Sequence, residues 1–181
     1  MLKAAPGPRR MAGHLEAART KEAVYVRVVG LGNFNNAGPL REYCEKAFND
    51  DIRNVIVDLA HCTGLDSTFM GTLMGFIGFD GGPAIAVTVV NATPTTMRAM
   101  SSLGLPKILH VKEEPIDFPD CKLTRLREGW QDKRRRTLLI RDAHVALMKA
   151  DKENETRFGP FVEALVKEAR EVLDCDGPGD K

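Results

Sequence analysis

Alternating apolar and polar positions near the start of the chain predict two strands joined by a turn. Residues 14–19 (HLEAAR) form a first extended run and residues 23–29 (AVYVRVV) a second. In the second run every other residue is a valine that would face a core, namely Val24, Val26 and Val28. The polar residues 20–22 between the runs favour a hairpin.

Strands then alternate with helices up to about residue 111. The pattern first predicts a loop at 30–38, a helix of about three turns ending at 49–51, and a strand at 55–59. A loop at 61–66 then leads into a buried helix at 67–79, which Gly81-Gly82-Pro83 stops, and a strand follows at 84–90. The last predicted elements here are a helix from 91–95 to Leu103, capped by Gly104, and a short strand at 107–111. The order β-β-α-β-α-β-α-β predicts an α/β fold with a βαβ sheet of about five strands and helices packed on it.

The pattern changes after Pro115 and Pro119. Residues 130–150 and 157–173 carry apolar residues at helical spacing, with Pro160 expected in the first turn of the second helix. These segments predict a C-terminal helical hairpin. We therefore expect a flexible tail at 1–12, one domain at 13–118 and a helical extension at 119–176. The hairpin's role is left open between covering its own domain, forming a homodimer and docking a partner.

Composition excludes several classes of function. The 26 Lys and Arg residues nearly balance the 25 Asp and Glu residues, so the net charge of +1 gives no reason to expect binding to nucleic acid or an anionic membrane. No apolar run is long enough to span a bilayer, and no secretory signal is visible, so we expect a cytoplasmic protein. The cysteines lack metal-ligand spacing, which predicts reduced thiols, no metal and no cofactor: Cys44, Cys62, Cys121 and Cys175.

The loops at 30–38 and 61–67 follow strands, and in βαβ proteins such loops bind ligands. In the second loop, Asp66 or Ser67 is suited to cap the next helix, and Ser67 and Thr68 place hydroxyls in its first turn. A phosphate on a hydroxyl there would be favoured by the helix dipole and the open N–H groups. Taken alone, however, an Asp-Ser pair before a helix is an ordinary cap.

A wider resemblance adds to this pattern. The stretches KAFNDDIRNVIVDLAHCTGLDSTFMGTL and AIAVTVVNATPTTMRAMSSLGLPKILHV resemble the STAS family, the bacterial anti-sigma-factor antagonists and their relatives, over roughly residues 13–115. The resemblance implies a non-catalytic regulator that binds an anti-sigma factor or serine protein kinase. It also implies that phosphorylation switches the protein, at Ser67 or, as second candidate, at Thr68, and that a phosphatase resets it. It places partner contacts at Asn33, Phe34, Asn35, Asp66, Ser67, Thr68, Phe69 and Met70.

Two positions differ from the family pattern. The loop around Asn33 lacks the acidic residue that antagonists commonly carry, and Phe69 stands where glycine usually follows Ser-Thr. Phe69 is therefore either a partner contact or a core residue, and the core is the commoner place for it.

Other functional sites are less well supported. Ser67 lies in no G-x-S-x-G elbow and no motif relates it to a histidine, while Gly30, Gly32 and Gly38 match no phosphate-binding loop. The basic run 133–136 is typical of a solvated helix face. The remaining alternative is a STAS-fold scaffold or a small-ligand or nucleotide sensor without a phosphorylation switch, in which Ser67 only caps its helix.

Overall fold

The computed structural model describes residues 13–78, 85–112, 114, 122–127, 129 and 132–175, with side chains placed up to residue 168. The expected tail at 1–12 and the helix stop at 81–83 lie outside the described residues. In chain order the elements are β1 (His14–Arg19), β2 (Val24–Gly32), α1 (Phe34–Asn49), β3 (Asn54–Asp58), β4 (Cys62–Leu65), α2 (Ser67–Phe76), β5 (Ala86–Val90), α3 (Pro94–Ser101), a 3₁₀ turn η1 (Leu105–Lys107), β6 (His110–Val111), β7 (Thr124–Arg125), α4 (Lys133–Ala150) and α5 (Lys152–Cys175).

The sheet is mixed, as the α/β pattern predicts, and its order is β6-β5-β3-β2-β1-β7, with β4 paired to β2. The neighbouring pairs from β2 to β6 are parallel, whereas β1 runs antiparallel to both β2 and β7. The described residues thus form seven strands rather than about five. The additional strands β4 and β7 span only four and two residues, too short to give a period-2 pattern.

The predicted alternation in β2 is confirmed, because Val24, Val26 and Val28 are completely buried. The next strand, β3, carries an aspartate, Asp58, that is only 2% exposed. Its carboxylate accepts hydrogen bonds from the Nε of Arg27 at 3.1 Å and the Nδ2 of Asn91 at 3.0 Å. These bonds compensate for the loss of water, so a charged group can end an otherwise apolar strand.

The segment 30–38, expected to be a loop, instead ends β2 and begins α1. Asn33 caps α1 by accepting a hydrogen bond from the amide of Asn35, and the Asn36 side chain accepts one from the amide of Asn33. This is a capping box built from asparagines, which glycine and asparagine content alone does not reveal. Pro39 lies inside α1 and cannot donate to the Asn35 carbonyl, which accepts instead from the amide of Gly129.

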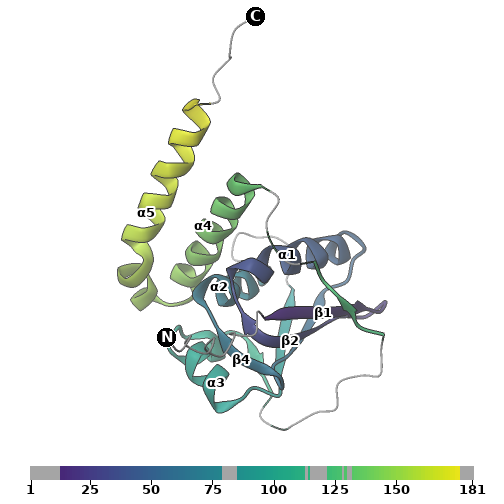
Figure 1. The fold of residues 1–181 in the computed structure, drawn as a ribbon. Coiled ribbons are helices and arrows are strands. Elements are labelled where there is room, and N and C mark those ends of the chain that lie inside the picture. The colour runs from purple at the N-terminus through teal and green to yellow at the C-terminus, as the bar shows by residue number, and fades with distance from the viewer. Residues whose placement is uncertain are drawn as a thin grey trace, which may run out of the picture.

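The last two helices form the predicted hairpin, and Figure 1 shows α4 lying between α5 and α2. The second helix starts earlier than predicted, at Lys152, so Pro160 lies beyond its first turn. Figure 1 also shows that the hairpin rises from the side of the sheet domain at which α2 lies. Of the three roles left open for the hairpin, this arrangement has it covering part of its own domain.

Candidate functional site

Asp66 is the residue that caps α2, which settles the choice between Asp66 and Ser67. Its Oδ1 accepts a hydrogen bond from the amide of Phe69 at 2.8 Å, and its Oδ2 accepts one from the amide of Phe34 at 2.9 Å. Burial raises the pKa of the Asp66 carboxyl, while these two hydrogen bonds oppose the rise. One carboxylate therefore joins the start of α2 to the start of α1 and brings the two sequence-predicted loops together.

The end of β2 and the start of α1, which Asp66 holds, present apolar side chains to solvent. Leu31 is 38% exposed and Phe34 is 37% exposed, two of the three large hydrophobic residues exposed in the described part of the chain. Asn35 is also exposed, whereas Asn33 is half-buried as the cap of α1. Leu31 was not among the predicted contacts, because a residue at the end of an apolar strand gives no sign in sequence that it will face water. We call Leu31, Phe34 and Asn35 the rim.

Ser67 is the first residue of α2 and is hydrogen-bonded to a histidine far along the chain. Its Oγ lies 3.0 Å from the Nε2 of His144 in α4. The other ring nitrogen, Nδ1, lies 2.7 Å from the carbonyl oxygen of Ile140. Because a carbonyl can only accept, Nδ1 carries the proton of the neutral ring, and the Ser67 hydroxyl therefore donates to Nε2.

His144 is only 3% exposed and packs against aromatic rings of α5. Its ring packs edge-on against Phe158 and Phe161, with ring centroids 4.8 and 4.9 Å apart. Burial lowers the pKa of His144, and the hydrogen bond to Ile140 and the nearby charge of Asp66 oppose that shift. The environment thus favours the neutral ring that accepts from Ser67. Sequence reasoning missed this residue because 77 positions separate it from Ser67.

One turn after Ser67, α2 and α4 approach each other closely at a glycine. A Cβ placed on Gly71 would lie 2.2 Å from the carbonyl oxygen of Ala143, so only glycine fits there with the helices as they stand. One turn later, a Cβ on Gly75 would meet nothing within 4 Å. The closest approach of the two helices therefore requires glycine at this one position in α2.

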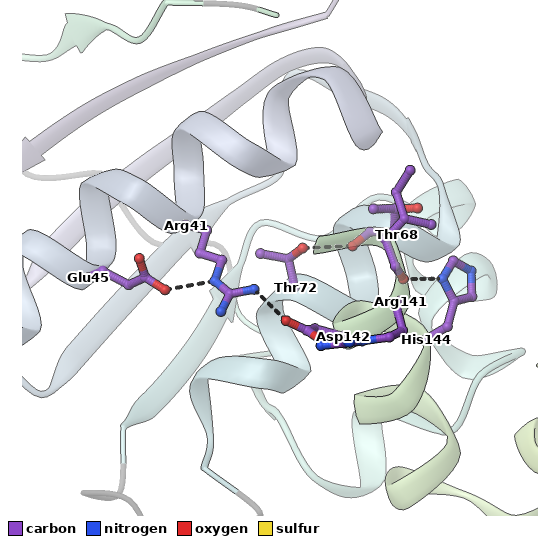
Figure 2. A network of polar contacts seen from close by, with 8 residues as sticks. Arg41, Glu45, Thr68, Thr72, Arg141, Asp142 and His144 are labelled. Atoms are coloured by element: carbon purple, nitrogen blue, oxygen red, sulfur yellow. Dashed lines mark hydrogen bonds and ion pairs between the residues drawn. The ribbon is translucent and has the colours of Figure 1, made fainter. Parts of the chain in front are cut away.

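Polar contacts fasten α4 and α5 at two further places. Figure 2 shows Arg41 of α1 bonded both to Glu45 and to Asp142 of α4, at 2.7 and 3.2 Å. At the other end of α4, the buried Asn154 donates to the carbonyl oxygens of Leu103 and Leu147, at 3.1 and 2.9 Å. The hairpin is thus attached to the domain beside Ser67, beside α1 and beside the turn after α3.

The remaining predicted contact residues lie inside the molecule. Phe69 is completely buried, and Met70 and Thr68 are 4% and 6% exposed. Phe69 therefore belongs to the core in this structure, and its side chain presents no surface to a partner. Within α2, the carbonyl oxygen of Thr68 accepts a hydrogen bond from the Thr72 hydroxyl at 2.8 Å.

Within the described residues, no cluster of three or more metal-binding side chains occurs and no helix is long and apolar enough to cross a membrane. Cys44 and Cys62 are buried free thiols, as predicted, and burial raises the pKa of Cys44 to about 12. The side chains of Cys121 and Cys175 lie outside the described residues. The basic run at the start of α4 is largely exposed, and Lys133 and Arg135 pair with Glu168 and Asp132.

Comparison with known proteins identifies the family. The sequence model of the STAS domain matches residues 14–116, which is more than half of the chain. Among solved structures, the unphosphorylated anti-sigma factor antagonist SpoIIAA is similar, with 18% identity, 55% of this chain and 89% of that chain covered, and a TM-score of 0.48. An anti-sigma factor antagonist from Mycobacterium paratuberculosis is similar too, with 19% identity, coverage of 57% and 87%, and a TM-score of 0.48. A search of curated proteins gives no match. On the strength of the matched domain, this chain belongs to the STAS family.

Proposed function

We propose that this protein is a non-catalytic, cytoplasmic STAS regulator that binds an anti-sigma factor or serine kinase and is switched by phosphorylation of Ser67. The observation that carries the proposal is the placement of Ser67 at the start of α2, beside a rim that Asp66 holds through the amide of Phe34. A phosphorylatable hydroxyl and exposed apolar residues therefore share one edge of the domain.

The chemistry of this edge suits a switch. An apolar rim gains free energy when a partner removes it from water, at roughly 25 cal/mol per Å² of apolar surface. A phosphate on Ser67 would add about −1.5 to −2 charges beside Asp66, which disfavours the desolvation that such an interface needs. Binding by the unmodified form and release by the phosphorylated form follow, and a phosphatase would restore binding.

Phosphorylation by the anti-sigma kinase of the source organism, with ATP, tests the proposal. We expect one phosphate on the wild type, located by peptide mass analysis at Ser67, and none on Ser67→Ala. Thr68→Ala is the matched control, because it removes the neighbouring, buried hydroxyl and should leave the modification in place. Ser67→Ala should still bind the kinase, whereas Ser67→Asp should not. Equal binding by the last two variants would contradict the switch.

One observation favours the alternative of a ligand sensor. A cavity of about 410 Å³ lies between α1, α2 and α4, lined on its apolar side by Phe48, Phe76, Leu139 and Ala146 and on its polar side by Arg41 and Lys149. Its size falls within the range of small-molecule sites, which is roughly 300–1,000 Å³. A ligand there would raise the unfolding temperature of wild type and Ser67→Ala equally, whereas nucleotides or metabolites that raise neither would count against a sensor.

A further inference from the structure

We propose that the hairpin of α4 and α5 is an intramolecular lid on α2, and that docking of this lid and phosphorylation of Ser67 exclude each other. The inference rests on the proposed function for its biological meaning, since it concerns regulation of the same serine. Its physical basis is independent, because it follows from contacts between the hairpin and the domain.

The docked lid engages the acceptor hydroxyl of the switch. The Ser67 Oγ is hydrogen-bonded to His144 at 3.0 Å, and the His144 ring packs against Phe158 and Phe161. A kinase needs the serine in its own cleft, with Oγ free to attack a phosphoryl group and its proton accepted by a catalytic base. In the docked state α4 lies against the half-buried Ser67, and the hydroxyl proton is already donated to His144.

The lid also covers the surface of α2 that extends from Ser67 toward its C-terminal end. Ala143 of α4 lies against Gly71, and Leu139 and Ala146 line the adjoining cavity with Thr72 and Gly75. A partner that reaches Ser67 along α2 would meet α4 first. The rim at Leu31 and Phe34 stays exposed, so a partner can make first contact there and then compete with α4 for α2.

Phosphorylation would in turn disfavour the docked lid. A phosphorylated Oγ has no proton to donate, so the buried Nε2 of His144 loses its donor. The phosphate also brings a charge of about −1.5 to −2 near the partly buried Asp66 carboxylate. Because binding free energies are reciprocal, a modification that opens the lid is also one that the closed lid opposes.

The ion pairs at the margins of the lid are of a kind that water can replace, whereas Leu139, Ala146 and Leu147 of α4 are buried in the core. Arg41 and Asp142 are 39% and 38% exposed at their side chains, and the Lys107–Asp151 pair at the other end involves a lysine that is 76% exposed. Exposed pairs of this kind each contribute little to stability. The lid is therefore held by apolar packing of α4 and by a few polar contacts, of which the one at Ser67 is open to covalent change.

Hydrogen exchange on the full chain tests lid docking without any kinase. Gly71→Ala places a methyl group against the Ala143 carbonyl and should speed exchange of the α4 amides about tenfold or more. Gly75→Ala is the matched control: it makes the same change in the same helix, where nothing lies within 4 Å, and should leave α4 exchange unchanged. The β3 and β5 amides, read in the same experiment, report that the domain stays folded. Unchanged α4 exchange in Gly71→Ala would overturn the proposal.

A second arm tests mutual exclusion by installing phosphoserine at position 67 during synthesis. We expect α4 and the start of α2 to lose protection relative to the unmodified chain. Equal protection of α4 in the two proteins would overturn the proposal. Greater protection of α4 in the phosphorylated chain would also overturn it, because the phosphate would then bind a protonated His144. If these two arms succeed but no kinase modifies Ser67, the lid stands and the proposed function fails. If a kinase does act, Gly71→Ala should be modified about tenfold faster than Gly75→Ala.

Discussion

The sheet domain and the C-terminal hairpin are held in place by different physical means. In the domain, completely buried apolar residues such as Val26, Val57 and Phe69 come from distant parts of the sequence and pack into one core. The hairpin adds Leu139, Ala146 and Leu147 to that core, and it is attached further by the close contact at Gly71 and by hydrogen bonds at its margins. A change at one exposed position leaves such a core intact, whereas the polar contacts of the hairpin come from a few groups that can be altered one at a time.

The largest contrast should come from two phenylalanines. Phe69→Ala empties a completely buried position and should lower the free energy of unfolding by about 3–5 kcal/mol. Phe161→Ala removes a 44% exposed ring whose contact is with His144, and should cost about 1 kcal/mol. Urea unfolding followed by far-ultraviolet circular dichroism measures both. A Phe69→Ala protein of normal stability that no longer binds its partner would return Phe69 to the partner surface.

Local sequence patterns predict the core strands and the cap of α2, but not the contact between the hairpin and α2. The strands that carry the core were found because period-2 alternation and β-branched runs follow directly from how a strand meets a core. Asp66 was found as a candidate cap because capping uses neighbours in sequence. His144 was not found as a partner of Ser67, since their contact depends on how α4 packs against α2, which no local pattern encodes. The early start of α1 was missed because a capping box of asparagines resembles a loop in composition.

A smaller contrast should separate the two aspartate caps. Asp66→Ala removes the acceptor for the amides of Phe69 and Phe34 and should cost about 1–2 kcal/mol of domain stability. It should also loosen the rim, visible as faster exchange of the Phe34 amide. Asp132→Ala removes the cap of α4, which accepts from the amide of Arg134, and should speed exchange in α4 while leaving the Phe34 amide unchanged. If both variants loosened the rim equally, the domain and the hairpin would behave as one cooperative unit.

The smallest effect we expect is on the pH dependence of lid docking. Burial lowers the pKa of His144 from its ordinary 6.5, so the docked lid holds fewer protons than the open lid between that lowered pKa and 6.5. Stability from docking is therefore fully present above 6.5 and is lost as the pH falls through this window. Asp66, which caps α2 and acts electrostatically on His144, has a pKa raised from 3.8. Its contribution to stability therefore has the opposite sign: it is present below pH 3.8 and is lost as the pH rises from 3.8 through the raised pKa.

A comparison of two proteins at two pH values isolates this effect. Urea unfolding of the wild type at about pH 7.5 and about pH 5.5 should show a loss of stability at the lower pH that is smaller in His144→Asn. The other three histidines and Asp66 are present in both proteins, so their contributions largely cancel in the difference. If the two proteins lost stability equally, His144 would not be the titrating group. If the wild type were instead stabilised at the lower pH relative to the variant, the attraction of Asp66 for a protonated His144 would outweigh burial, and the hydrogen bond from Ser67 would not be what holds the ring in place.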